Sequence, residues 1–213
     1  MRTFNAVLLA SLNKGKFVEF EKLLAAHHIK LAHLQEFVRN SNFLSHVKED
    51  GKTYYDNAFK KCLAAFQAAK VPTISDDSGL EVLGLEGKPG IHSARFAEAK
   101  AAESQDKANR QKLLTSLKGK KGEDRKARFV CNLVFMVEGV VLKAEGVCSG
   151  RIAEAEKGEH GFAYDSLFIP DEGDGRSFAE MSAEEKDRIS HRARALESLV
   201  EQFKDREIEF VRP

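Results

Sequence analysis

The chain has 213 residues, 42% of them hydrophobic and 31% charged, enough for one large domain or two closely packed lobes. Its 34 Lys and Arg residues nearly balance 33 Asp and Glu residues, which argues against a general nucleic-acid-binding protein. No apolar run approaches the roughly 20 residues of a membrane-spanning helix. The three cysteines are widely spaced, which argues against a disulfide framework and a zinc site and fits a reducing cytoplasm.

The N-terminal apolar segment is too short for a signal peptide, and residues 7–10 predict a buried strand. A short loop rich in Ser, Asn, Gly and Lys follows at residues 11–16, and then apolar residues recur at helical spacing. A strand, a loop and a helix start in this order can hold phosphate, because unpaired helix amides point toward the loop. The pattern is not a Walker motif, and a solvated lysine-bearing loop is the alternative interpretation.

A second strand is expected at residues 29–34, and Thr53 is expected to cap the next helix. The apolar side chains of that helix recur with a period near 3.6 residues. Asn57 and Lys61 lie four residues apart on another face, where they are available to a ligand. Glu49 stands just before the helix and is a candidate oxygen ligand.

Residues 72–80 predict a strand that ends in two adjacent carboxylates, Asp76 and Asp77, followed by Ser78 and Gly79. Neighbouring strand side chains point to opposite faces, so the two acids are expected to do different jobs. Acidic and hydroxyl oxygens at a strand end suit a hard cation such as Mg²⁺. A polar turn with no ligand is the alternative.

The middle of the chain predicts a mixed sheet. A strongly apolar strand at residues 127–137 is expected to be central, and Glu138-Gly139 predicts a hairpin into a strand at residues 140–152. Before these two strands we expect a short strand at 80–85, a turn at 87–90 and extended or irregular chain at 91–95. An exposed helix is expected at 103–117, and a flexible charged link at 119–125.

A second glycine-rich loop, residues 157–165, presents Phe162 and Tyr164 among small residues. Stacking of a nucleotide base on such a ring is worth about 1–3 kcal/mol and does not read the base, which Asp165 or nearby backbone groups would do. An aromatic-bearing turn is the alternative. Near the end of the chain, Ser182 and Glu185 form a capping box that starts a short helix.

A break near Ser190 is expected next, because one continuous helix would place Lys186 and His191 about 140° apart. The final helix then begins at His191 and Arg192, and a helix start favours an anion.

Four of these segments, in this order, resemble the inosine triphosphate pyrophosphatase family, which clears deaminated purine nucleoside triphosphates such as ITP, dITP and XTP. They are residues 11–16, residues 75–80 with 87–95, residues 161–165, and Glu185-Lys186 with residues 190–192. The resemblance implies an α/β fold whose elongated mixed sheet is flanked by helices, with two lobes and a substrate cleft between them. It also implies one catalytic domain over residues 1–213, Mg²⁺ as cofactor and a homodimer.

By position, the resemblance assigns the metal ligands to Glu49 and Asp77, with Asp77 also the general base. The implied substrate-binding residues are Ser11, Leu12, Asn13, Lys14, Gly15, Lys16, Lys61, Ser78, Phe162, Ala163, Tyr164, Asp165, Lys186, His191 and Arg192. The family usually has glycine where this chain has Leu12 and Ala163, and a side chain restricts positive φ and close ligand approach. We expect the change at Leu12 to matter more, because its loop would surround the phosphates.

The predicted activity is hydrolysis of ITP, dITP or XTP to the monophosphate and pyrophosphate. Lys14, Lys16, Lys61 and Lys186 would neutralise the leaving group. His191 and Arg192 would donate to the 6-keto oxygen, and adenine, with an amino group there, would be rejected. Two alternatives stay open: a nucleotide-binding protein with little turnover, and a pyrophosphatase for other modified nucleotides.

Overall fold

The computed structural model describes residues 1–38, 41–99 and 104–211. These residues form two compact units. The first contains Met1–Asp77, Cys131–Gly146 and Arg192–Pro213, and the second contains Ser78–Val130 and Val147–His191.

A six-stranded sheet has the order β3-β2-β4-β5-β6-β7. Its strands are β2 (Val7–Leu9), β3 (Leu31–Ala32), β4 (Thr73–Val82), β5 (Lys126–Val137), β6 (Val140–Ile152) and β7 (Phe168–Pro170). Strand β2 pairs in parallel with β3 and β4, whereas β6 pairs antiparallel with β7. The sheet is therefore mixed, as predicted, and β5 is one of its central strands.

The acidic pair does not end a strand, and this part of the prediction was wrong. β4 continues through Asp76, Asp77 and Ser78 to Val82. Strand β2 pairs with Thr73 and Ile74 at the start of β4, and β5 is the neighbour of β4 on its other side. The expected separate strand at 80–85 is instead the end of β4 followed by a short 3₁₀ helix, Leu83–Leu85.

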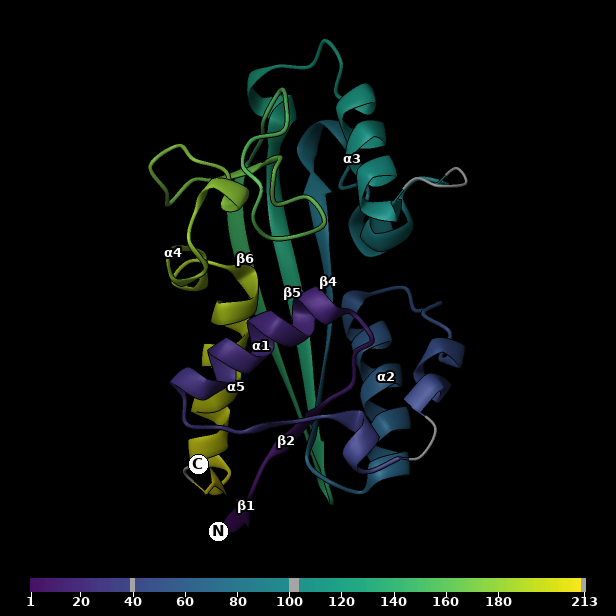
Figure 1. The fold of residues 1–213 in the computed structure, drawn as a ribbon, viewed down its shortest axis with the longest axis vertical. Helices are drawn as coiled ribbons and strands as arrows, with labels where there is room; N and C mark the ends of the chain where they lie inside the picture. Colours follow the sequence, from purple (N-terminus) through teal and green to yellow (C-terminus); the bar gives the residue numbers. More distant parts are fainter. Residues whose placement is uncertain (39–40, 100–103, 212–213) are drawn as a thin grey trace. The chain divides into compact units, whose positions relative to one another are not determined.

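In the first unit, helices cover both faces of the sheet. Helices α1 (Lys14–Ala26) and α5 (His191–Asp205) share a core cluster with Leu133 and Phe135 of β5. Helix α2 (Tyr54–Ala69) packs on Val134 and Met136 of the same strand. Since side chains alternate along a strand, α2 lies on the face opposite to α1 and α5 (Figure 1).

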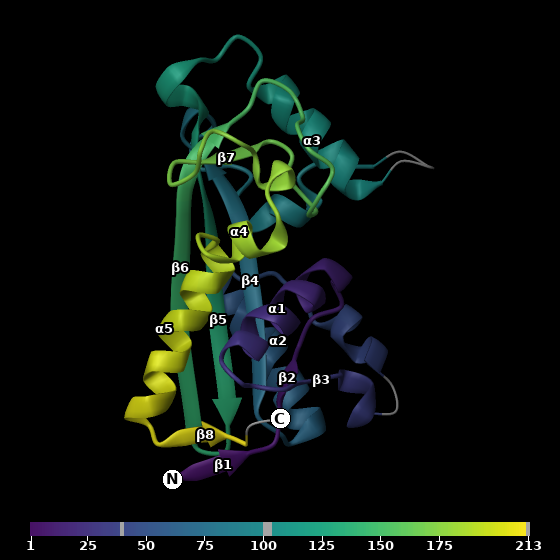
Figure 2. The same cartoon turned by 60° about the vertical axis from the view of Figure 1, so that its left-hand side comes forward.

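The N-terminal segment makes two strands rather than one. Strand β1 (Arg2–Phe4) pairs in parallel with β8 (Ile208–Phe210) in a separate two-stranded sheet (Figure 2). The helix capped by Thr53 forms as predicted, with Thr53 Oγ1 accepting from the Asp56 amide. None of the helices in the described ranges is long and apolar enough to cross a membrane.

The second unit contains α3 (Gln105–Ser116) and α4 (Ala183–Asp187), and Leu113 of α3 shares a core cluster with Leu80 of β4 and Phe129 of β5. Position 103 of the helix expected at 103–117 lies outside the described residues. Residues 91–95, expected to be extended or irregular, form part of a 3₁₀ helix, Gly90–Arg95. Ser93 explains the difference, because its hydroxyl donates to the Gly90 carbonyl at 2.6 Å and accepts from the Leu80 amide at 2.8 Å.

The charged segment at 119–125 ends in a short 3₁₀ helix, Gly122–Arg125, and its last side chain is buried. The Arg125 guanidinium donates to the carbonyls of Leu117, Ile152 and Ala153. A buried guanidinium with carbonyl acceptors holds a segment in place. The C-terminal end of the segment is therefore anchored, and flexibility of the residues before Arg125 stays a prediction.

Candidate active site

The first turn of α1 contains the lysines of the predicted phosphate loop. Asn13 caps the helix, its side chain accepting from the Lys16 amide at 3.1 Å, and Ser11 Oγ accepts from the Asn13 amide at 3.2 Å. Lys14, Gly15 and Lys16 therefore belong to the helix, and only residues 11–13 of the predicted loop lie before it. Their middle residue, Leu12, is 55% exposed.

Asp76 is completely buried among cations of the first unit. Its Oδ2 lies 2.8 Å from Lys16 Nζ and 3.7 Å from Arg192 Nε. Burial opposes the charge of this carboxylate, but Lys16, Arg192 and Lys61 outweigh it and hold the Asp76 pKa well below its usual range. Arg192 Nη1 also donates to Glu19 Oε2 at 2.8 Å.

Asp77 contacts a different set of residues, from α2 and the segment before it. Asn57 Nδ2 donates to Asp77 Oδ2 at 3.0 Å. Lys61 Nζ lies 3.7 Å from Asp77 Oδ1 and 3.5 Å from Glu49 Oε1, so the two predicted metal ligands lie next to one ammonium group. The closest contacts of Asp76 and Asp77 differ, as expected for neighbouring side chains on opposite faces of a strand, while their different jobs stay a prediction.

The pKa values of Asp77 and Lys61 are both raised, for different reasons. Burial raises the pKa of Asp77 and outweighs the lowering by Lys61, Lys16 and the Asn57 hydrogen bond. For Lys61, burial lowers the pKa, but the carboxylates of Asp76, Asp77 and Glu49 outweigh it and raise the pKa. The Lys61 side chain therefore stays positively charged, and the Asp77 carboxylate beside it takes up a proton at a higher pH than an ordinary Asp.

The carboxylate pair fits a magnesium ion. Within residues 1–38, 41–99 and 104–211 there is no cluster of three or more His, Cys, Asp or Glu side chains able to hold a metal. Mg²⁺, however, is commonly held by one or two carboxylates, with water and substrate phosphates as its other ligands. Glu49 and Asp77 provide two such carboxylates. The backbone after Glu49 is fixed to α2, since the Gly51 amide donates to Asn57 Oδ1 at 2.8 Å.

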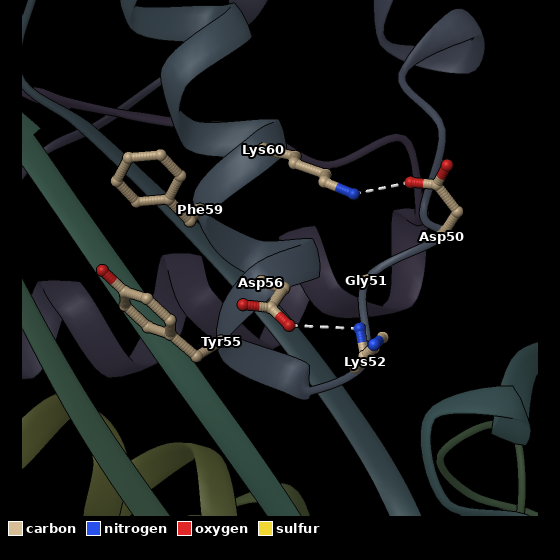
Figure 3. A pocket seen from close by; sticks show the side chains of 7 residues that line it. All are labelled: Asp50, Gly51, Lys52, Tyr55, Asp56, Phe59 and Lys60. Carbon is tan, nitrogen blue, oxygen red and sulfur yellow. Dashed lines mark hydrogen bonds and ion pairs between the residues drawn. The ribbon is translucent and has the colours of Figure 1, made fainter.

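A hollow of about 350 Å³ lies between this segment and the start of α2 (Figure 3). It is lined by Asp50, Gly51, Lys52, Tyr55, Asp56, Phe59 and Lys60. Asp50 and Lys60 form an ion pair at 2.5 Å across its edge. None of the site residues predicted from the sequence lines this hollow, so the acidic group and the hollow are separate features of the first unit.

In the second unit, a lysine lies against the predicted base-stacking ring. Lys186 Nζ lies 5.4 Å from the ring centroids of both Phe162 and Phe178. It also lies 2.8 Å from Asp165 Oδ2, which accepts from the Phe162 amide at 2.8 Å. Gly161 precedes them at φ 75°, and a Cβ there would lie 2.2 Å from Asp165 Oδ2. Glycine is therefore required at this position.

The two aromatic rings of the loop differ in exposure. Tyr164 is buried, and its hydroxyl donates to the Ser93 carbonyl at 2.8 Å. Burial raises the pKa of the Tyr164 hydroxyl above its ordinary value. Phe162 is only half-buried, so of the two rings Phe162 is the one open to a base.

The residues that replace family glycines also differ from expectation. Ala163 has φ 52°, in the left-handed region that glycine adopts without cost, whereas Leu12 is not among the residues with positive φ. The structural consequence of losing glycine therefore falls on Ala163 rather than on Leu12.

The remaining predicted residues lie near the start of α5 and in β4. The His191 ring stacks on Phe129 with centroids 4.7 Å apart and planes at 10°, and it is buried. Ser78 is half-buried in the second unit. Sequence reasoning missed the contact of Glu19 with Arg192 and that of Phe178 with Lys186. Glu19 stands three residues after Lys16, one turn along the same helix face, which was an available signal.

Comparisons with known proteins identify the family. A model of the Ham1 family matches residues 7–202. The chain belongs to the Ham1 family. This result confirms the resemblance found in the sequence motifs.

Two relatives and two solved structures show how far the Ham1 likeness extends. A dITP/XTP pyrophosphatase of Syntrophobacter fumaroxidans is 43% identical over 198 residues, 92% of this chain and 81% of that protein. A dITP/XTP pyrophosphatase of Geobacillus kaustophilus is 41% identical over 201 residues, 93% of this chain and 94% of that protein. The Ham1 protein structures of Staphylococcus aureus and Coxiella burnetii both align with a TM-score of 0.77, at 35% and 33% identity. They cover 95% and 96% of this chain and all of the solved chains.

Proposed function

We propose that this chain hydrolyses deaminated purine nucleoside triphosphates to the monophosphate and pyrophosphate. The observation that carries the proposal is the placement of Glu49 and Asp77 next to Lys61, an acidic pair beside a phosphate-binding cation. The dITP/XTP pyrophosphatases that are about 40% identical over nearly the whole chain support the same substrate class.

Glu49 and Asp77 would hold Mg²⁺, which, when bound, neutralises phosphate oxygens and acidifies water. Asp77 accepts a proton from the water whose oxygen forms the new bond to the α-phosphorus, and the bond from that phosphorus to the pyrophosphate oxygen breaks. Asn57 orients Asp77 by donating to Oδ2. Lys61 and Lys16, with Lys14 beside them, bind the triphosphate oxygens and stabilise the leaving charge.

The second unit would bind the base. Phe162 stacks on its face, and Lys186 and Asp165 keep that ring in place through the contacts described above. Because Lys186 belongs to the second unit and its ammonium lies 5.4 Å from the Phe162 ring centroid, we assign it to the base side rather than to the leaving group. His191 and Arg192 remain the proposed donors to the 6-keto oxygen, which adenine replaces with an amino group.

The proposal predicts a pattern across substrates. ITP and XTP should release pyrophosphate with Mg²⁺ and not with a chelator, while ATP, which has an amino group in place of the 6-keto oxygen, should react far more slowly at equal concentration. Asp77→Asn should abolish pyrophosphate release. Asp50→Asn, which changes the exposed acid next to Glu49, should retain it. Equal rates on ITP and ATP would contradict the proposed substrate class. Faster release from dTTP would favour another modified-nucleotide pyrophosphatase.

A nucleotide-binding protein with little turnover is the second candidate, favoured by the left-handed Ala163 in the loop that would hold the base. Tight ITP binding without pyrophosphate release in excess Mg²⁺ would support it. A homodimer, a cytoplasmic location and a single catalytic domain are further parts of our proposal. Light scattering of the purified chain measures the first of them.

A further inference from the structure

Both backbone groups of Ala163 are bound by side chains of α3. Asp106 Oδ2 accepts from the Ala163 amide at 3.1 Å, and Arg110 Nη1 donates to the Ala163 carbonyl at 3.0 Å. Asp106 and Arg110 are four residues apart, so they lie one above the other on one face of the helix. We call this pair the α3 clamp.

The clamp is itself held in place. Arg110 Nε donates to Glu156 Oε2 at 2.8 Å, and the same oxygen accepts from Ser166 Oγ at 3.1 Å. Arg110 is mostly buried, with a side-chain exposure of 20%. Its guanidinium is therefore fixed at both ends, which makes the position of the Ala163 carbonyl well defined.

Ala163 needs such support because of its backbone conformation. The left-handed region is unfavourable for a residue that has a Cβ, and Ala163 occupies this region at φ 52°. This conformation separates the directions of its two neighbours. Tyr164 enters the core and donates to the Ser93 carbonyl, while Phe162 stays half-buried.

The same helix also fixes the acceptor of Tyr164. Asn109 Nδ2 donates to the carbonyls of Ser93 and Ala94, both at 3.2 Å. Three residues of α3, one each at positions 106, 109 and 110, therefore define the course of the loop that carries Phe162. The sequence predicts only an exposed polar helix here. In the structure, Asp106, Asn109 and Arg110 of this helix bind backbone groups of residues 93, 94 and 163.

We propose that Asp106 and Arg110 are positioning residues that set the orientation of Phe162 for base stacking. The inference rests on the proposed function, in which Phe162 stacks on the purine. Neither residue is among the first-unit residues that are proposed to bind the triphosphate of the substrate. Loss of the clamp should therefore weaken binding of the base and leave the chemical step unchanged.

The test compares Asp106→Ala and Arg110→Met, which remove the acceptor and the donor of the clamp, with Lys107→Met, a charge removal at an exposed position of the same helix. For each clamp variant, we expect the KM for ITP to rise about tenfold, as for loss of one hydrogen bond to a charged group. We expect kcat to change by less than about twofold. Pyrophosphate, which has no base, should inhibit all variants with an unchanged constant. Lys107→Met should behave as the unmodified chain in every assay.

Rescue provides a readout that a general structural role would not give. Glycine adopts the left-handed region at no steric cost, so Ala163→Gly should reduce the KM increase caused by Arg110→Met. A decreased affinity for pyrophosphate, a lower kcat with unchanged KM, or no rescue by glycine would each overturn the positioning role.

Amide hydrogen exchange separates this inference from the proposed function. Residues 161–165 should exchange faster in Asp106→Ala and Arg110→Met than in the unmodified chain. Unchanged or slower exchange would overturn the clamp even in a chain without turnover. If the unmodified chain does not hydrolyse ITP, the proposed function fails, and the Kd for ITP replaces KM in the comparison. Normal ITP hydrolysis with an unchanged KM in both clamp variants would refute the clamp alone.

Discussion

Replacement of Asp76 by Asn tests the buried charge cluster of the first unit. The Asp76 carboxylate is completely buried, with Lys16 Nζ at 2.8 Å and Arg192 Nε at 3.7 Å. At an effective dielectric constant of about 20, one such contact at 2.8 Å corresponds to about 6 kcal/mol of Coulomb attraction, most of which offsets desolvation. Asn keeps the volume of the side chain but removes its charge.

The variant leaves two nearly buried cations without their shared carboxylate. Removal of one partner of a buried ion pair costs about 3–5 kcal/mol, so we expect the free energy of unfolding to fall by that amount. For a chain of this length each kcal/mol lowers Tm by about 2–4 °C, so Tm should fall by about 6–20 °C. Thermal and urea unfolding measure both quantities, and the exposed pair of Asp50 and Lys60 supplies the control variant Asp50→Asn.

The pH dependence gives the same experiment a second readout. The pKa of Asp76 is lowered in the folded chain, so its stabilisation is fully present above the unfolded pKa near 4 and is lost as the pH falls below it. The difference between the unmodified chain and Asp76→Asn should be constant from neutral pH down to about pH 5 and should shrink in acid. A Tm loss no larger than that of Asp50→Asn would refute our account of the cluster.

Three other predictions follow from the site and the core. Ala163→Gly should raise the free energy of unfolding by about 1 kcal/mol, because glycine accepts φ 52°, whereas Leu12→Gly should not; urea unfolding measures both. Phe162→Ala should raise the KM for ITP by about 5- to 150-fold through loss of stacking, measured by pyrophosphate release, and an unchanged KM would contradict its role. The three cysteines, all buried free thiols, should react with a thiol reagent only after unfolding, since burial raises the pKa of Cys62 to about 12. Reaction of all three in the native chain would contradict the described core.

Local sequence signals predicted much of the fold. The hairpin at Glu138-Gly139 joins β5 to β6, and Gly139 has the positive φ of such a turn. The capping box of Ser182 and the break before His191 separate α4 from α5 as expected. Each of these features depends on residues within a few positions of one another, so a single sequence contains the relevant information.

Features that depend on distant partners were not predictable in the same way. Asp76 and Asp77 look like a turn in isolation, and they lie within a buried strand because Lys16, Arg192 and Lys61 balance their charges. Those cations come from three different helices. A long-range pairing of this kind overrides the local preference of Asp for turns.

The candidate site shows the same division between local and distant signals. The sequence brought attention to Glu49, Asp77 and Lys61, but only the structure shows that one ammonium lies next to both acids. The sequence also ranked Leu12 above Ala163 as the serious loss of glycine. Backbone dihedral angles, which the residue type does not determine, reverse that order.

Hydrolysis of ITP in water labelled with heavy oxygen tests the central claim, that Asp77 directs water to the α-phosphorus. With Mg²⁺ present, the account predicts that the label enters the nucleoside monophosphate, that pyrophosphate is released unlabelled, and that Asp77→Asn gives neither product. Label in pyrophosphate or in inorganic phosphate, or normal turnover by Asp77→Asn, would contradict it.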